Sequence, residues 1–225
     1  MTSHRTLAMR EINARFTRLK STGQIGEQFH KIRSAVESLD ALHANADPCL
    51  PREAHVARVG RSAQQLNSKL DSFRSALGSA YSQASGKLSS EAVDRLNLKE
   101  GRYSEELRRT VLAMPLAERI AYVGELSKSE DAGPLLAALS SAPAILHQVP
   151  KDVLRAAEQQ FISTFAPDVV ALQAELDDAM TLANAALMTA GKMATEFQDQ
   201  QELDRISKAQ EAAAQAQQQM QEALA

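Results

Sequence analysis

The last quarter of the sequence limits the fold most strongly, because it contains no proline after Pro167 and a single glycine, Gly191. Residues 168–225 can therefore form one continuous helix or two helices in line. A helix of these 58 residues would be about 87 Å long, whereas a compact chain of 225 residues has a radius of gyration of only about 17 Å. The segment must either break near Gly191 and fold back, or project and pack against another molecule, since helix propensity alone seldom stabilises such a segment in water.

Apolar residues elsewhere recur at steps of three and four, which is the spacing of a helix face that packs against other helices. Two such helices precede residues 47–51, where Pro48 and Pro51 interrupt the pattern. A third helix begins near Arg52, and we expect it to bend or end near Gly86, where glycine and serine accumulate. Its seam has heptad-like spacing and consists of Val56, Val59, Ala63, Leu66, Leu70, Phe73, Leu77, Ala80 and Ala84.

Five of the seven prolines lie between residues 115 and 167 and divide this part of the chain into short helical pieces. We expect these pieces at residues 90–97, 104–114, 115–127, 134–141 and 151–165. Low aromatic content and the absence of tryptophan also favour helix over sheet. The predicted fold is all-α: an elongated bundle with coiled-coil-like seams (residues 1–87), a proline-punctuated middle domain (88–166) and a long C-terminal helix with an Ala/Gln-rich tail (167–225).

The tail is rich in helix formers but poor in core residues. From Gln198 onward the sequence has nine glutamines and seven alanines. Its few large apolar side chains form a thin stripe that cannot hold the tail against a globule without a second face. We therefore predict a partner interface, in a homo-oligomer or a larger protein assembly, at Leu203, Ile206, Met220 and Leu224.

Charge is distributed unevenly along a chain whose net charge is −3. Residues 1–33 carry a net charge of +5, and residues 168–225 carry −7. Such asymmetry can guide head-to-tail association or place the basic end on an acidic surface. The candidates for a polyanion contact, nucleic acid included, are Arg5, Arg10, Arg15, Arg18 and Lys20. A solvated helix face explains the same residues, because no aromatic side chains are interleaved with them and no DNA-binding motif follows.

The sequence shows no motif for catalysis, for a metal or for a cofactor. A single cysteine, Cys49, excludes an internal disulfide and a thiolate zinc site within one chain. The five histidines are dispersed, and residues 23–26 are too short for a phosphate-binding loop. We therefore expect a protein that is not an enzyme and that has no metal or cofactor, with an enzyme hidden in residues 88–166 as the opposing hypothesis.

No cleavable signal is predicted, because Arg10, Glu11 and Arg15 interrupt any apolar stretch near the start. The longest uncharged stretch in the middle of the chain, residues 134–150, is broken by Pro143 and is too short to span a bilayer. We expect a soluble protein that is cytoplasmic or virion-associated.

Two segments resemble helical assembly, scaffolding or internal virion proteins of tailed bacteriophages. They are residues 210–225 (QEAAAQAQQQMQEALA) and residues 135–143 (LLAALSSAP). The resemblance implies a structural role in a particle and transfers no functional residue to this chain. Two alternatives stay open: a bacterial secreted effector or translocator, which shares the low aromatic content and long helices, and a nucleic-acid-associated protein that uses the basic N-terminal helix.

Overall fold

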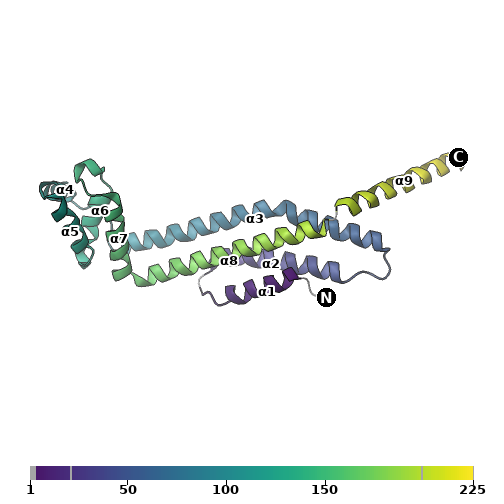
Figure 1. Cartoon of the computed structure of the whole chain (residues 1–225), viewed down its shortest axis with the longest axis horizontal. Helices are drawn as coiled ribbons and strands as arrows, with labels where there is room; N and C mark the ends of the chain where they lie inside the picture. Colours follow the sequence, from purple (N-terminus) through teal and green to yellow (C-terminus); the bar gives the residue numbers. More distant parts are fainter. Residues whose placement is uncertain (1–3, 21, 199, 225) are drawn as a thin grey trace. The chain divides into compact units, whose positions relative to one another are not determined.

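A computed structural model describes residues 4–20, 22–198 and 200–224 of the chain (Figure 1). Every regular element in these residues is a helix, which confirms the all-α fold. The chain divides into two compact units: unit 1 comprises Met1–Tyr81 with Asp178–Ala225, and unit 2 comprises Ser82–Asp177. This division differs from the three consecutive segments expected, because the C-terminal residues group with the N-terminal helices instead of forming a segment of their own.

Unit 1 contains α1 (His4–Phe16), α2 (Gly23–Ala44), α9 (Gln200–Leu224), the first part of α3 (Arg52–Arg95) and the last part of α8 (Pro167–Phe197). Figure 1 shows α1, α2, α3 and α8 side by side. Aromatic rings join α1 to α2 and α2 to α8: Phe16 stacks on Phe29 with centroids 3.9 Å apart, and His43 stacks on Phe197 with centroids 4.3 Å apart. These contacts hold the bundle together at several points along its helices.

The predicted seams supply the core of unit 1. On α3 the buried seam residues include Val59, Ala63, Leu66, Leu77 and Ala80. The seam of α8 consists largely of small buried residues, namely Ala179, Ala183, Ala186 and Ala190. Small side chains let a neighbouring helix approach closely: a Cβ at Gly191 would lie 3.3 Å from Leu70 Cδ1. Gly191 therefore lies inside α8 as a close-contact position, and the break between α8 and α9 falls after Phe197 instead.

Helix α3 continues past Gly86 to Arg95, so of the bend or end expected near residue 86 the end is wrong, and the separate helix expected at 90–97 is wrong as well. Gly78 and Gly86 are exposed and have no neighbouring atoms within 4 Å of a hypothetical Cβ, so they cost helix propensity without forcing a break. The helix ends where Asn97 adopts a left-handed backbone, with φ of 49°. The Leu98 N–H donates to Val93 O at 2.9 Å and the Asn97 N–H donates to Asp94 O at 3.4 Å, the two bonds of a Schellman motif.

Unit 2 is a small helical domain whose short helices follow the prolines. It contains α4 (Ser104–Ala113), α5 (Leu116–Leu126), η1 (Glu130–Ala132), α6 (Gly133–Ser140), η2 (Ala144–Leu146) and α7 (Lys151–Phe165), with the end of α3 and the start of α8. Pro115 and Pro150 immediately precede α5 and α7, and Pro134 lies in the first turn of α6. Its buried core is formed by Ala92, Leu96, Val111, Val123, Leu126, Ala132, Leu136, Leu139, Val149, Leu154, Ala157, Phe161, Ala166 and Val169.

Gly133 marks a close backbone approach in unit 2. A Cβ at this position would lie 2.0 Å from Leu96 O and 3.1 Å from Asn97 O. Helix α6 can therefore start against the C-terminal end of α3 only if position 133 has no side chain. This contact fixes the place of α6, which contacts α4, α5, α7 and η1.

Candidate functional site

The residues of the predicted interface stripe on the C-terminal helix differ in burial in the structure. Ile206 is buried, and it lines a pocket of about 480 Å³ together with Pro51 and Ala54 of the same chain. Met220, in contrast, is 59% exposed. The side chains of Leu203 and Leu224 lie outside the described residues. The first part of α9 therefore has a packing partner within unit 1, whereas Met220 is left largely exposed.

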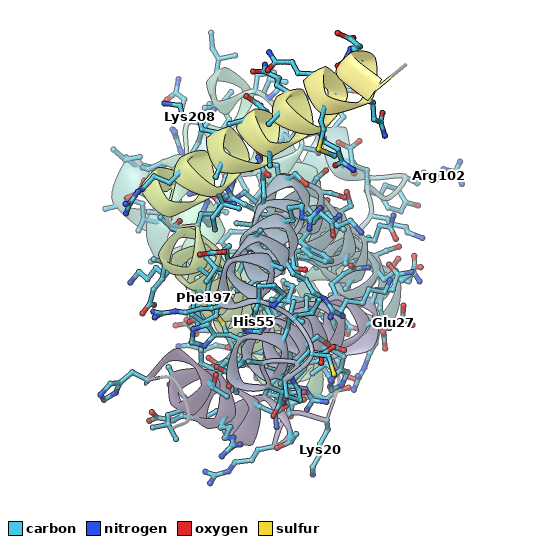
Figure 2. All side chains as sticks on the ribbon, turned by 90° about the vertical axis from the view of Figure 1, so that its right-hand side faces the viewer. Lys20, Glu27, His55, Arg102, Phe197 and Lys208 are labelled. Carbon is cyan, nitrogen blue, oxygen red and sulfur yellow. The ribbon has the colours of Figure 1, made fainter. Side chains whose placement is uncertain are left out.

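Helix α9 exposes its side chains over most of its described length. Residues 211–222 are all exposed, as is Lys208 (Figure 2). A regular helix that buries no residue over three turns has no stabilising apolar face within the described part of this chain. This exposed segment, residues 211–222 of α9, is the candidate association surface.

The basic residues of the N-terminal segment lie on the solvent side of α1 and of the loop after it. Arg10, Arg15, Arg18 and Lys20 are exposed, Lys20 being labelled in Figure 2. The opposite face of α1 buries Thr6, Met9 and Phe16. The side chain of Arg5 lies outside the described residues. This arrangement fits a polyanion contact and a solvated helix face equally well.

Unit 2 contains an apolar groove that sequence reasoning missed. It has a volume of about 690 Å³, in the range of ligand-binding pockets. Its walls come from the end of α3, from α7 and from the start of α8. Of the described residues in these walls, Asp177 alone is titratable. The groove suits an uncharged or cationic group with apolar surface. It is lined by Ser85, Leu88, Ser89, Ala92, Val93, Leu98, Gln159, Gln160, Ile162, Ser163, Val169, Val170, Gln173, Ala174 and Asp177.

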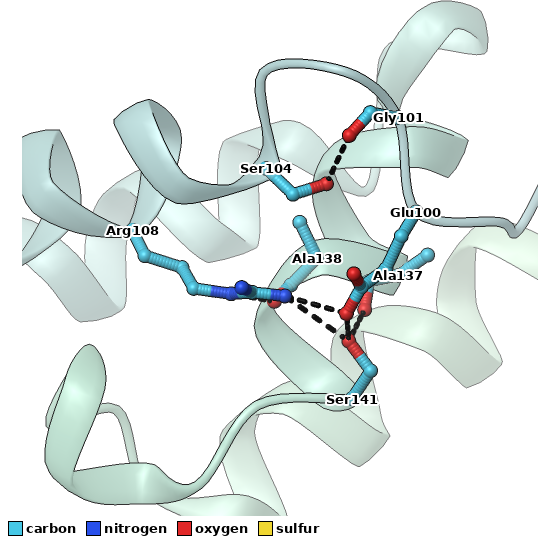
Figure 3. A network of polar contacts seen from close by, with 7 residues as sticks. All are labelled: Glu100, Gly101, Ser104, Arg108, Ala137, Ala138 and Ser141. Atoms are coloured by element: carbon cyan, nitrogen blue, oxygen red, sulfur yellow. Dashed lines mark hydrogen bonds and ion pairs between the residues drawn. The ribbon is translucent and has the colours of Figure 1, made fainter.

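A polar network joins the loop before α4 to the end of α6 (Figure 3). The Arg108 guanidinium donates to Ala138 O at 2.7 Å and to Glu100 Oε1 at 2.5 Å. Ser141 Oγ lies within hydrogen-bond distance of Glu100 Oε1 and, at 2.7 Å, of Ala137 O. Arg108 thus satisfies Ala138 O, a carbonyl near the C-terminus of α6, whereas Ala137 O also accepts the Ser141 backbone N–H at 3.0 Å.

The same network is poorly suited to activating Ser141 as a nucleophile. The hydrogen bond from Ser141 holds the pKa of Glu100 below its usual range, and the Arg108 guanidinium lowers this pKa further, while burial acts in the opposite direction. A carboxylate with a lowered pKa is a weak general base at neutral pH. The network is therefore best explained as a structural cap of α6.

Arg119 is a buried arginine whose donors are directed at oxygen atoms within unit 2. Its guanidinium donates to Met114 O at 2.6 Å, to Leu112 O at 2.9 Å and to Gln148 Oε1 at 3.0 Å. These bonds tie the end of α4 to the loop before α7. Hydrogen bonds of this kind compensate the burial of the charge, so Arg119 also has a structural role.

The described part of the chain offers few other candidates for metal binding or for a reactive side chain. No three His, Cys, Asp or Glu side chains there gather in a way that could hold a metal ion. Cys49 is exposed in the connection between α2 and α3. In the same residues, no helix combines the length and the apolar character needed to cross a membrane.

No family model, curated protein or solved structure matches this chain. The resemblance to bacteriophage assembly proteins therefore depends on residues 135–143 and 210–225 alone. In the structure, the first segment belongs to α6 and the loop after it, and residues 211–222 of the second segment lie in the exposed part of α9.

Proposed function

We propose that this chain is a non-enzymatic assembly protein whose copies associate through the second half of α9. The observation that carries the proposal is the exposure of every residue from 211 to 222 in a regular helix. A structural component of a virion or a scaffold is the setting that the sequence resemblance suggests for such association.

The energetics of an isolated helix support a partner for this segment. A helix in water is marginal without tertiary packing, even when its residues have high helix propensity. The segment exposes Met220, which would gain about 1.5 to 3 kcal/mol from full burial. A second copy offers a matching face that buries Met220 and the neighbouring alanines on both helices at once.

The charge pattern favours a second copy of α9 as the partner. Residues 212–221 contain no charged side chain, so two such helices can pack without like-charge repulsion. Ala212, Ala213, Ala214 and Ala216 permit close approach, and the glutamines between them can exchange hydrogen bonds across the interface.

A matched pair of methionine variants tests the proposal. Met220→Glu places a charge in the proposed interface, whereas Met188→Glu places one at an equally exposed methionine of α8, since the two residues are 59% and 63% exposed. We expect Met220→Glu to lower the molar mass measured by light scattering at a given concentration and Met188→Glu to leave it unchanged. Equal masses for the parent and both variants would contradict self-association through α9.

A further inference from the structure

A second, smaller pocket in unit 2 has a chemical character different from that of the apolar groove. Its volume is about 230 Å³, and it lies between one face of α7 and the segment that joins α6 to η2. The α7 residues have the spacing of a single helix face. The lining residues are Ser140, Ala142, Ala144, His147, Lys151, Leu154, Arg155 and Glu158.

His147 lines this pocket with a buried side chain. The residue is 1% exposed, and its Nδ1 accepts a hydrogen bond from the Val149 N–H at 3.0 Å. A neutral imidazole that accepts at Nδ1 carries its proton on Nε2. Nε2 is buried and has no hydrogen-bond partner among the described residues. A buried N–H without an acceptor is unfavourable, so this atom indicates that an acceptor from outside the chain belongs here.

The charges around the pocket select a negatively charged acceptor. Lys151 and Arg155 line the pocket, and neither forms an ion pair with a described residue. Glu158 is the one acidic residue among the described residues that line the pocket, so these side chains together carry a net positive charge. The start of α7 adds the partial positive charge of a helix N-terminus, where Pro150 provides no side-chain cap. The Arg119 guanidinium donates to the backbone oxygen of His147 at 3.4 Å.

We propose that this pocket binds a small oxyanion, a carboxylate or phosphate group, through His147 Nε2–H, Lys151 and Arg155. Each of the three groups donates to an anionic oxygen, and charge-assisted bonds of this kind are among the stronger hydrogen bonds in proteins. The proposal concerns unit 2 and does not depend on the association of α9.

The test is an NMR titration of the full chain that follows the His147 ring signals, assigned by their loss in His147→Gln. Sodium phosphate and sodium acetate are added separately at constant ionic strength, with sodium chloride as the control salt. We expect saturable shifts of the His147 signals with phosphate or acetate and none with chloride. Whichever anion gives the lower midpoint identifies the preferred oxyanion.

Charge variants complete the test, because Lys151 and Arg155 are exposed and their loss should leave the fold intact. Lys151→Gln or Arg155→Gln should weaken binding by about tenfold, as expected for one charged hydrogen bond. Arg102→Gln, which removes an exposed charge outside the pocket, should leave the midpoint unchanged. Unsaturable shifts, shifts that chloride reproduces, or equal effects of all three variants would overturn the proposal.

Discussion

Replacing Gly133 by alanine tests whether unit 2 depends on the contact between α6 and the end of α3. The new Cβ would lie 2.0 Å from Leu96 O, whereas ordinary van der Waals contact begins near 3.4 Å. Both atoms belong to or lie next to the backbone, so no side-chain rotation can relieve the overlap. Overpacking typically costs about 1–3 kcal/mol and occasionally more. We expect Gly133→Ala to lower the unfolding free energy of unit 2 by about 3 kcal/mol or more.

Gly124→Ala is the matched control, because Gly124 is also a helical glycine of unit 2 but has nothing within 4 Å of a hypothetical Cβ. Alanine there reduces the entropy of the unfolded chain and should stabilise by about 0.4–1 kcal/mol. The two glycine-to-alanine changes therefore have opposite predicted signs.

Urea denaturation followed by circular dichroism measures both variants. With a slope of about 1–3 kcal/mol per molar urea, a loss of about 3 kcal/mol lowers the midpoint by roughly 1–3 M. Hydrogen exchange read by mass spectrometry assigns the change to unit 2, through faster exchange in α6 and α4. A Gly133→Ala midpoint equal to or above that of Gly124→Ala would refute the close approach of α6 to Leu96.

Two further predictions concern the α3 seam and the polar network of Figure 3. Leu66→Asp buries an unpaired charge at a position that is 7% exposed and should lower the unfolding free energy of unit 1 by several kcal/mol. Lys69→Asp, at an exposed position of the same helix, should change the urea midpoint little. Similar midpoints for the two variants would contradict a buried seam. The folded-state pKa of Glu100 is lowered, chiefly by the Ser141 hydrogen bond, so its stabilising effect is present above the unfolded pKa and is lost as the pH falls through the folded pKa. Glu100→Gln should therefore flatten the loss of stability in this acidic range, and a carboxyl titration by NMR should give Glu100 a pKa lower than that of an ordinary exposed glutamate; a pKa that is not lowered would contradict the network.

The sequence predicted the helices well where apolar spacing and proline act locally. Pro115 and Pro150 mark the starts of two helices of unit 2, and the seam from Val56 to Ala84 identifies the face that α3 turns to its neighbours. The end of α3 was mispredicted because glycine and serine lower helix propensity without stopping a helix. The actual stop depends on the left-handed backbone of Asn97.

The grouping of the helices and the pockets could not be predicted in the same way. Residues 178–225 belong to a unit with residues 1–81, a pairing between distant segments that no local pattern encodes. The apolar groove combines residues from α3, α7 and α8, each of which has the pattern of an ordinary helix face by itself. His147 becomes a candidate binding residue only when its burial and its Nε2 without a hydrogen-bond partner are known, and the sequence shows neither.

The most direct test of the proposed function is the molar mass of two chains measured by light scattering across a range of concentrations. The full chain is compared with a chain that ends at Gln210, which keeps the buried Ile206 and removes the exposed second half of α9. We predict a mass above that of the monomer for the full chain, the monomer mass of about 22–23 kDa for the shortened chain, and the same melting temperature for both. A full chain that stays at its monomer mass of 24.4 kDa at every concentration, or a shortened chain that associates equally well, would contradict assembly through α9.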